Sequence, residues 1–189
     1  MNYDLFERQA SARKLLPLYF FHGQQRYLAR RGIRIVCQAI AETTGAPPQH
    51  ERLDASEVAL GEVLARARSL LLFGGWQVIE VDRFDHYGSG ALGKEGPRKG
   101  SLADGAGIAG KRAGADEESA VLGGGASKAD LTALEAYLER PPEGSTLVFV
   151  AGYLRKDEFK KKLYKLLVPF TVECRVSAND VPRWINRLA

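Results

Sequence analysis

The sequence predicts an α/β fold with a mostly parallel, five-stranded sheet and helices on both of its faces. Short apolar segments of strand length alternate along the 189 residues with amphipathic segments of helical length, which is the pattern of βα units. A composition of 45% hydrophobic and 26% charged residues is that of a globular protein. We therefore expect one compact domain with a substantial core.

The first half of the chain supplies three strands and two helices. Residues 18–22, Leu-Tyr-Phe-Phe-His, are an apolar run that ends at Gly23 and predicts a buried strand. Apolar residues then recur at helical spacing from Gln24 to Thr43, until Gly45-Ala-Pro-Pro ends the helix. The remaining predicted elements of this half are a short strand at 50–54, a helix at 56–71 and a buried strand at 76–81.

The segment 88–126 has a different composition from the rest of the chain. It holds 12 of the 20 glycines, is rich in alanine, serine and charged residues, and shows no periodicity. Such a segment buries too little apolar surface to offset the entropy of ordering its backbone. We expect it to be a disordered insertion between two structured elements.

Regular patterning returns at Ser127, a favourable N-cap residue. The predicted elements that follow are a helix at 131–138, ended by Pro141-Pro142, a strand at 146–151, a helix at 156–167 and a strand at 170–176. Asn179 is suited to cap one more helix, which contains Trp184 and Ile185. These two apolar residues need a surface to pack on, so we expect a second domain beyond the helix.

Several classes of protein are excluded by simple features of the chain. The N-terminus lacks the basic and then apolar layout of a signal peptide, and the early apolar run is too short to span a bilayer. Cys37 and Cys174 form neither a disulfide framework nor a metal set, and the three histidines lack a second ligand at metal spacing. We expect a cytoplasmic protein with no membrane segment, no metal and no cofactor.

Positive charge is concentrated in two segments. Residues 24–34 carry four arginines and no acidic residue, and residues 155–165 carry six basic residues and two acidic ones. Clustered basic residues suit contact with a polyanion, although a solvated helix face is the alternative. The candidate weak DNA contacts are Arg26, Arg30, Arg34, Lys160 and Lys161.

The turn after the first strand stands where a phosphate-binding P-loop would be. That loop needs Gly-x4-Gly-Lys-Ser/Thr, because backbone amides and the lysine hold the phosphates while the hydroxyl ligates magnesium. Counting from Gly23, the three required positions hold Leu28, Ala29 and Arg30. The sequence therefore predicts a loop that binds no nucleotide.

No other constellation in the chain predicts catalysis. Two near-matches to a P-loop, starting at Gly88 and Gly105, lack the hydroxyl and follow no strand. We expect Asp82 to be a solvent contact at a strand end, His22 to be satisfied by the backbone, and Cys37 to be a core residue.

The run Leu70-Leu-Leu-Phe73 precedes Gly74-Gly75 at the end of a predicted helix. Helical periodicity assigns Leu70 and Leu71 to the core, which leaves Leu72 and Phe73 without an internal place. They either staple the following turn or protrude as an anchor for the apolar pocket of a partner.

Taken together, these segments resemble the N-terminal region of the delta subunit of the bacterial DNA polymerase III clamp loader. The matching stretches are Leu18-Tyr-Phe-Phe-His-Gly23 with Tyr27-Leu28, Leu71-Leu-Phe-Gly-Gly75 with Trp76-Gln-Val-Ile79, Leu134 to Leu138 with Pro141-Pro142 and Thr146-Leu-Val-Phe149, and Val172-Glu-Cys174 with Val181-Pro-Arg-Trp-Ile185. Their order and spacing carry the resemblance, which covers everything except residues 88–126.

The resemblance implies a degenerate, P-loop NTPase-like AAA+ domain over residues 1–178, with 88–126 as an insertion and 179–189 as the start of a helical lid. It implies a subunit that binds and opens the sliding clamp without hydrolysing ATP, with Leu72 and Phe73, beside Leu71, as the clamp contact. The implied partners are the beta clamp, the gamma/tau and delta prime subunits, and primed DNA. The chain would belong to a DNA-directed DNA polymerase holoenzyme, a nucleotidyltransferase, and supply no active site of its own. The alternatives are an ATP-binding AAA+ or P-loop NTPase and a non-specific DNA-binding module.

Overall fold

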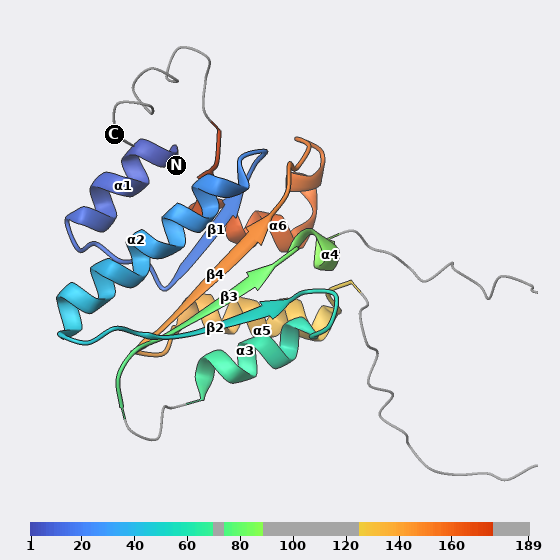
Figure 1. The fold of residues 1–189 in the computed structure, drawn as a ribbon. Helices are drawn as coiled ribbons and strands as arrows, with labels where there is room; N and C mark the ends of the chain where they lie inside the picture. Colours follow the sequence, from blue (N-terminus) through green and yellow to red (C-terminus); the bar gives the residue numbers. More distant parts are fainter. Residues whose placement is uncertain (70–73, 89–124, 176–189) are drawn as a thin grey trace, which may run out of the picture.

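A computed structural model describes residues 1–69, 74–88 and 125–175, and it shows an all-parallel, five-stranded sheet between two layers of helices (Figure 1). The strand order is β2-β3-β4-β1-β5. The strands are β1 (Leu18–His22), β2 (Gln49–Asp54), β3 (Gln77–Asp82), β4 (Ser145–Ala151) and β5 (Thr171–Glu173). The predicted α/β class, the number of strands and the three-layer arrangement are confirmed.

The helices α1 (Tyr3–Ser11) and α2 (Arg26–Thr44) cover one face of the sheet (Figure 1). Tyr19 and Phe21 of β1 point into this layer and pack against Phe6 of α1. At Gly32 the helix α2 comes so close to β1 that an added Cβ would lie 2.6 Å from the Phe21 ring. This layer lies over β1, β4 and β5, and its core includes only Val78 from β3 and no residue of β2.

The helices α3 (Leu60–Arg68), α5 (Lys128–Glu139) and α6 (Lys162–Leu167) contribute to the core on the opposite face. Phe20 of β1 points into this second core, where it contacts Phe84 and Tyr164. Because neighbouring residues of a strand point to opposite faces, the apolar run of β1 serves both cores at once. A capping box starts α5, with Ser127 accepting from the Asp130 amide and Asp130 accepting from the Ser127 amide.

Two predicted helices are shorter than expected. The helix expected at 56–71 begins only at Leu60, because the Asp54 carboxylate accepts bonds from both the amide and the hydroxyl of Ser56 and holds a turn there. The helix expected at 156–167 is interrupted at Lys161, which has ψ 144°, between a 3-10 turn η1 (Glu158–Lys160) and α6. The Lys161 ammonium donates to the Gly88 carbonyl, which fixes the break.

Helix α1 and two short elements, α4 (Asp85–Gly88) and the 3-10 turn η2 (Val168–Phe170), were not expected. The signal for α1 is nevertheless present, since the Asn2 side chain accepts from the Leu5 amide as an N-cap. Tyr3, Phe6 and Ala10 then bury one stripe of the helix. Within the described part of the chain, no helix is long and apolar enough to cross a membrane.

Candidate functional site at the carboxyl edge of the sheet

Ligand sites of parallel α/β sheets lie at the carboxyl ends of the strands, and the loop 23–25 occupies this position between β1 and α2. In a P-loop the backbone amides of this turn point at phosphate groups. Here the Gly23 amide donates to the Gly152 carbonyl at 3.2 Å, and the Gln25 amide donates to the Cys174 carbonyl at 3.4 Å. Two of the loop amides are therefore already used by the protein itself.

The side chains that follow the loop are also unsuited to a phosphate. Leu28 and Ala29, which stand at the glycine and lysine positions of a P-loop, are both buried in the core under α2. Arg30, at the hydroxyl position, is exposed. The lysine that would bind the phosphates and the Ser/Thr hydroxyl that would ligate magnesium are therefore both missing from their P-loop positions.

A pocket of about 420 Å³ lies beside the loop. Its lining includes His22, Gln25, Tyr153, Lys156 and Arg175. The expectation that the backbone satisfies His22 is wrong for Nδ1, because this buried atom has no hydrogen-bond partner among the described residues, and neither has Gln25 Oε1. Desolvation by burial lowers the pKa of His22, which favours the neutral imidazole.

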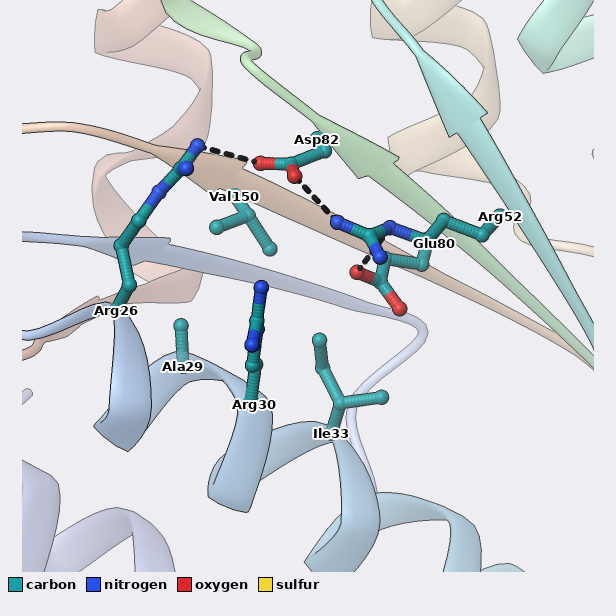
Figure 2. A pocket seen from close by; sticks show the side chains of 8 residues that line it. All are labelled: Arg26, Ala29, Arg30, Ile33, Arg52, Glu80, Asp82 and Val150. Carbon is teal, nitrogen blue, oxygen red and sulfur yellow. Dashed lines mark hydrogen bonds and ion pairs between the residues drawn. The ribbon is translucent and has the colours of Figure 1, made fainter.

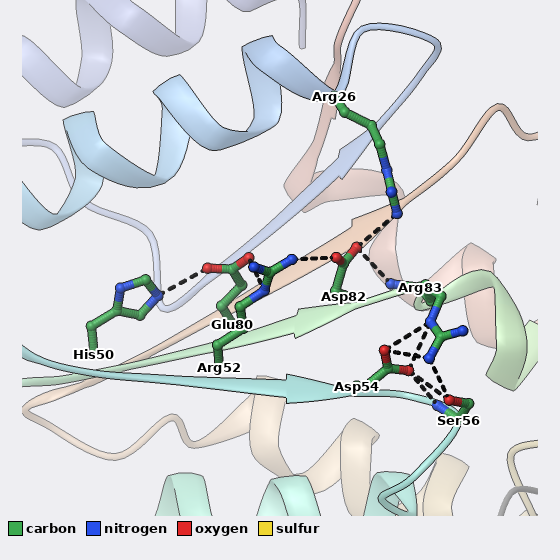
Figure 3. A network of polar contacts seen from close by, with 8 residues as sticks. All are labelled: Arg26, His50, Arg52, Asp54, Ser56, Glu80, Asp82 and Arg83. Atoms are coloured by element: carbon green, nitrogen blue, oxygen red, sulfur yellow. Dashed lines mark hydrogen bonds and ion pairs between the residues drawn. The ribbon is translucent and has the colours of Figure 1, made fainter.

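Asp82, at the end of β3, is the centre of an ion-pair network that links α2, β2 and β3 (Figure 3). Its carboxylate accepts from Arg26 at 3.1 Å, from Arg52 at 2.6 Å and from the Arg83 amide at 2.9 Å. The expectation of a simple solvent contact is therefore wrong. Desolvation opposes the charged form of Asp82, but the bond from Arg52 and the other partners outweigh it and lower the pKa of this carboxyl.

The network continues along β2 and β3. Arg52 also pairs with Glu80 at 3.3 Å, and Glu80 contacts His50 at 3.0 Å. Asp54, the neighbour of Asp82 in the sheet register, accepts from Arg83 and Ser56. The carboxylates of this edge are therefore held by cations, and no metal-binding group of three or more His, Cys, Asp or Glu residues occurs in the described ranges.

The structure separates the five predicted DNA-contact residues. Arg26, Arg30 and Arg34 lie on α2, and Arg26 is tied to Asp82. Lys160 and Lys161 lie at the junction of η1 and α6, whose helix packs against the opposite face of the sheet. Cys37 is half-buried at the margin of the α2 core, in partial agreement with its predicted place.

The predicted clamp contact, residues 71–73, lies outside the described residues, as do 89–124 of the insertion and 176–189. The two glycines that follow the contact are described, and both have positive φ, +70° at Gly74 and +103° at Gly75. Such backbone conformations suit a sharp change of chain direction.

A groove that sequence patterns did not reveal runs between α2 and the strands β2 and β3. It has a volume of about 540 Å³ and is lined by Tyr27, Arg30, Ile33, Arg34, His50, Arg52 and Glu80. A smaller pocket shares Arg30, Ile33, Arg52 and Glu80 with this groove and is also lined by Arg26, Ala29, Asp82 and Val150. Figure 2 shows the Arg30 side chain extending from α2 toward the sheet. The residues of the groove come from α2, β2 and β3, which the tertiary fold brings together. Their spacing along the sequence therefore could not predict the groove.

The parallel sheet, with β1 between β4 and β5 and leading through a loop into α2, defines a three-layer α/β fold. Among solved structures, the chain is similar to the DNA clamp loader delta protein of Bacillus subtilis, with a TM-score of 0.63 and 17% sequence identity. The match covers 98% of this chain and 46% of that one, so this chain spans about half its length. At this identity the likeness shows the fold. No family model matches the sequence, and no curated protein matches it.

Proposed function

We propose that this chain is a clamp-loader subunit of the delta type, which binds the sliding clamp and opens it without hydrolysing ATP. The observation that carries the proposal is an AAA+-like fold whose phosphate loop is closed by its own backbone. The amides of Gly23 and Gln25 donate hydrogen bonds to the carbonyls of Gly152 and Cys174. Leu28 and Ala29 are buried. Such a subunit has the fold of an AAA+ domain but no nucleotide site, so ATP hydrolysis is carried out by the neighbouring subunits.

The fold-level likeness to a clamp loader delta protein supports this role and agrees with the resemblance read from the sequence. In a complete loader the chain would lie beside the gamma/tau and delta prime subunits, around primed DNA in the cytoplasm. It would take part in a DNA-directed DNA polymerase holoenzyme as an assembly and clamp-opening component. The nucleotidyl transfer itself would belong to another subunit.

The clamp contact in this proposal is the pair Leu72 and Phe73, with Leu71 beside it. Helical periodicity leaves the pair without a core position, and Gly74 and Gly75, which follow it in the sequence, have positive φ angles that suit a turn. Burying one Leu and one Phe in a partner contributes about 1.5–3 kcal/mol each. The loss of both side chains would weaken the complex by roughly 100-fold or more.

The test is a paired measurement on the Leu72→Ala/Phe73→Ala variant: affinity for an immobilised bacterial sliding clamp, and melting temperature by circular dichroism. The matched control is Leu5→Ala/Val168→Ala, which removes two apolar side chains that are 45% and 52% exposed elsewhere. We expect the first variant to lose clamp binding at an unchanged melting temperature, and the control to keep it. Retained clamp binding together with a lowered melting temperature would show that the pair is a core staple.

A further inference from the structure

In the groove between α2 and the strands β2 and β3, the wall formed by α2 carries regularly spaced side chains. Tyr27, Arg30 and Arg34 are spaced by three and four residues along α2, so they form one stripe of the helix. The opposite wall is the face of β2 and β3, from which His50, Arg52 and Glu80 line the groove. The groove is thus an open channel beside a part of the sheet that contributes little to the α1–α2 core.

The charges of the groove are not balanced. The groove and the smaller pocket that adjoins it through shared residues hold four guanidinium groups, those of Arg26, Arg30, Arg34 and Arg52, against the carboxylates of Glu80 and Asp82. Asp82 binds Arg26 and Arg52, and Glu80 binds Arg52 and His50. Arg30 and Arg34 are exposed and have no ion pair or side-chain hydrogen bond within the described residues. The excess positive charge therefore lies on these two arginines.

Tyr27 adds an aromatic surface to the same stripe. Its side chain is 49% exposed, which makes it one of the few large apolar residues left open to solvent among those described. It stands one helical turn before Arg30, so its ring and the two free guanidinium groups line the same groove. Proteins that bind single-stranded nucleic acid combine these two kinds of side chain: the aromatic ring stacks on a base, and the arginines bind the phosphates.

We propose that this groove binds single-stranded nucleic acid, with Arg30 and Arg34 on phosphates and Tyr27 stacked on a base. Arginine suits phosphate because its planar guanidinium can donate two parallel hydrogen bonds. Arg30 and Arg34 are about 6 Å apart along the helix axis, so they can follow one strand. In a duplex the base faces are already stacked, and Tyr27 therefore favours a single strand. An acidic polypeptide could pair with Arg30 and Arg34, but it would not explain the exposed ring of Tyr27.

The site is independent of clamp binding and goes beyond the proposed delta-type function. The carboxylates of the groove are bound to their own cations, so they do not repel a phosphate as free charges would. Arg26 and Arg52 have a positioning role here, because their contacts with Asp82 hold α2 at its distance from β2. DNA and RNA single strands share the recognised groups, and the test distinguishes them.

The test measures fluorescence anisotropy of labelled oligothymidylate, oligouridylate and a duplex of equal length with the whole chain, between about 50 and 200 mM salt. Arg30→Ala/Arg34→Ala is expected to weaken binding at least about tenfold and to reduce the salt slope by about 1.4, because each single-strand phosphate contact contributes about 0.7. The control Lys128→Ala/Arg140→Ala removes the same charge from exposed positions at the two ends of α5, outside both basic segments, and should keep the affinity.

The ring is tested separately. Tyr27→Ala should lose roughly 5- to 100-fold in affinity for the single strands and little for the duplex, while Tyr27→Phe should retain binding. Melting temperatures confirm that each variant is folded. An equal loss in the control pair would show diffuse charge attraction, and an unaffected Tyr27→Ala variant would show a simple anion surface. Competition by polyglutamate as strong as that by oligothymidylate would assign the groove to acidic polypeptides. Each of these three results would overturn the proposal, and none depends on whether the chain binds a clamp.

Discussion

Gly23 lies against the backbone of Cys174, so closely that a Cβ at position 23 would be 2.4 Å from the Cys174 carbonyl oxygen. Gly23 also has φ +142°, a conformation that residues with side chains rarely adopt. The same Cys174 carbonyl accepts the Gln25 amide. The shape of the loop after β1 is therefore set by the chain that leaves β5, and a ligand is not needed to order it.

Substitution of Gly23 should destabilise the fold. Gly23→Ala imposes a strained backbone and displaces the chain after β5, for which we expect a loss of about 1–3 kcal/mol. In a chain of this size that corresponds to a melting temperature lower by roughly 2–12 °C. Gly152→Ala is the matched control, because an added Cβ there meets nothing within 4 Å. Equal melting temperatures of the two variants would contradict the close approach.

The chain should bind no magnesium nucleotide and show no ATPase activity. The reason is the loss of the glycine, lysine and hydroxyl positions at Leu28, Ala29 and Arg30, together with the engaged loop amides. Isothermal titration with ATP and magnesium provides the measurement. Saturable binding at micromolar concentrations would contradict the prediction and revive the class of ATP-binding P-loop proteins, including sites at the near-matches that begin at Gly88 and Gly105.

The pair of Asp54 and Arg83 should make stability depend on pH in the acid range. Desolvation disfavours the Asp54 carboxylate, but the bonds from Arg83 and Ser56 outweigh it and lower the pKa to about 2. Because the folded pKa lies below the ordinary value of about 3.9, the stabilisation is present above pH 4 and disappears as the pH falls toward 2.

Thermal melts across this range test the pair. Asp54→Asn should melt below the parent chain at neutral pH, and the difference should shrink between about pH 4 and pH 2. Arg83→Gln and the double variant complete a mutant cycle, in which the double variant should lose little more than either single one. A pH-independent difference would assign the effect of Asp54 to the turn at Ser56 and not to its charge.

The segment 89–124 should be replaceable without loss of stability. The residues that flank it are already joined, since the Ala126 amide donates to the Tyr87 carbonyl at 3.0 Å. A connection of roughly four to six residues is enough for such neighbouring ends, and the entropy of loop closure changes slowly with loop length. We expect nearly equal melting temperatures with a short glycine-serine linker. A large decrease would show that the segment packs on the domain.

The DNA affinity of the basic segment around Lys160 should be weak and strongly salt-dependent, because it depends on counterion release alone. Lys161 is held by the Gly88 carbonyl and Lys162 pairs with Glu135 at 2.8 Å, so part of this charge is already used. Lys160→Ala in the binding assay should change affinity by no more than a few-fold. Sequence-dependent binding that this substitution abolishes would indicate a dedicated DNA reader.

Much of the fold could be predicted because two central strands, β1 and β4, are largely apolar. All of β4 is buried, as are four of the five residues of β1, and continuous apolar runs of that length bounded by turn residues indicate strands buried on both faces. The ends of helices were less predictable. The start of α3 depends on the turn that Asp54 makes with Ser56, and the break before α6 depends on the bond from Lys161 to Gly88. Both contacts compete with helical periodicity, and the second joins residues far apart in sequence.

The site was harder to predict than the fold. The sequence alone showed that the loop after β1 lacks the P-loop residues, because the missing glycine, lysine and hydroxyl fall at three consecutive positions. The network around Asp82 was missed, since Arg26 and Arg52 reach it from 56 and 30 residues away. Their meeting depends on the parallel register that places Asp54 beside Asp82, and no single segment encodes that register.

The strand order has a consequence for how the chain folds during its synthesis. Among the strands of the described residues, β1 pairs with β4 and β5, and its register partner Phe149 follows Phe20 by roughly 130 residues. At about 5–20 residues per second, the ribosome needs roughly 6–26 s to produce that partner. In this interval β2 and β3 can pair with each other, whereas the aromatic segment of β1 has no strand to join and is open to aggregation. Completion of the sheet therefore waits for translation of its late strands.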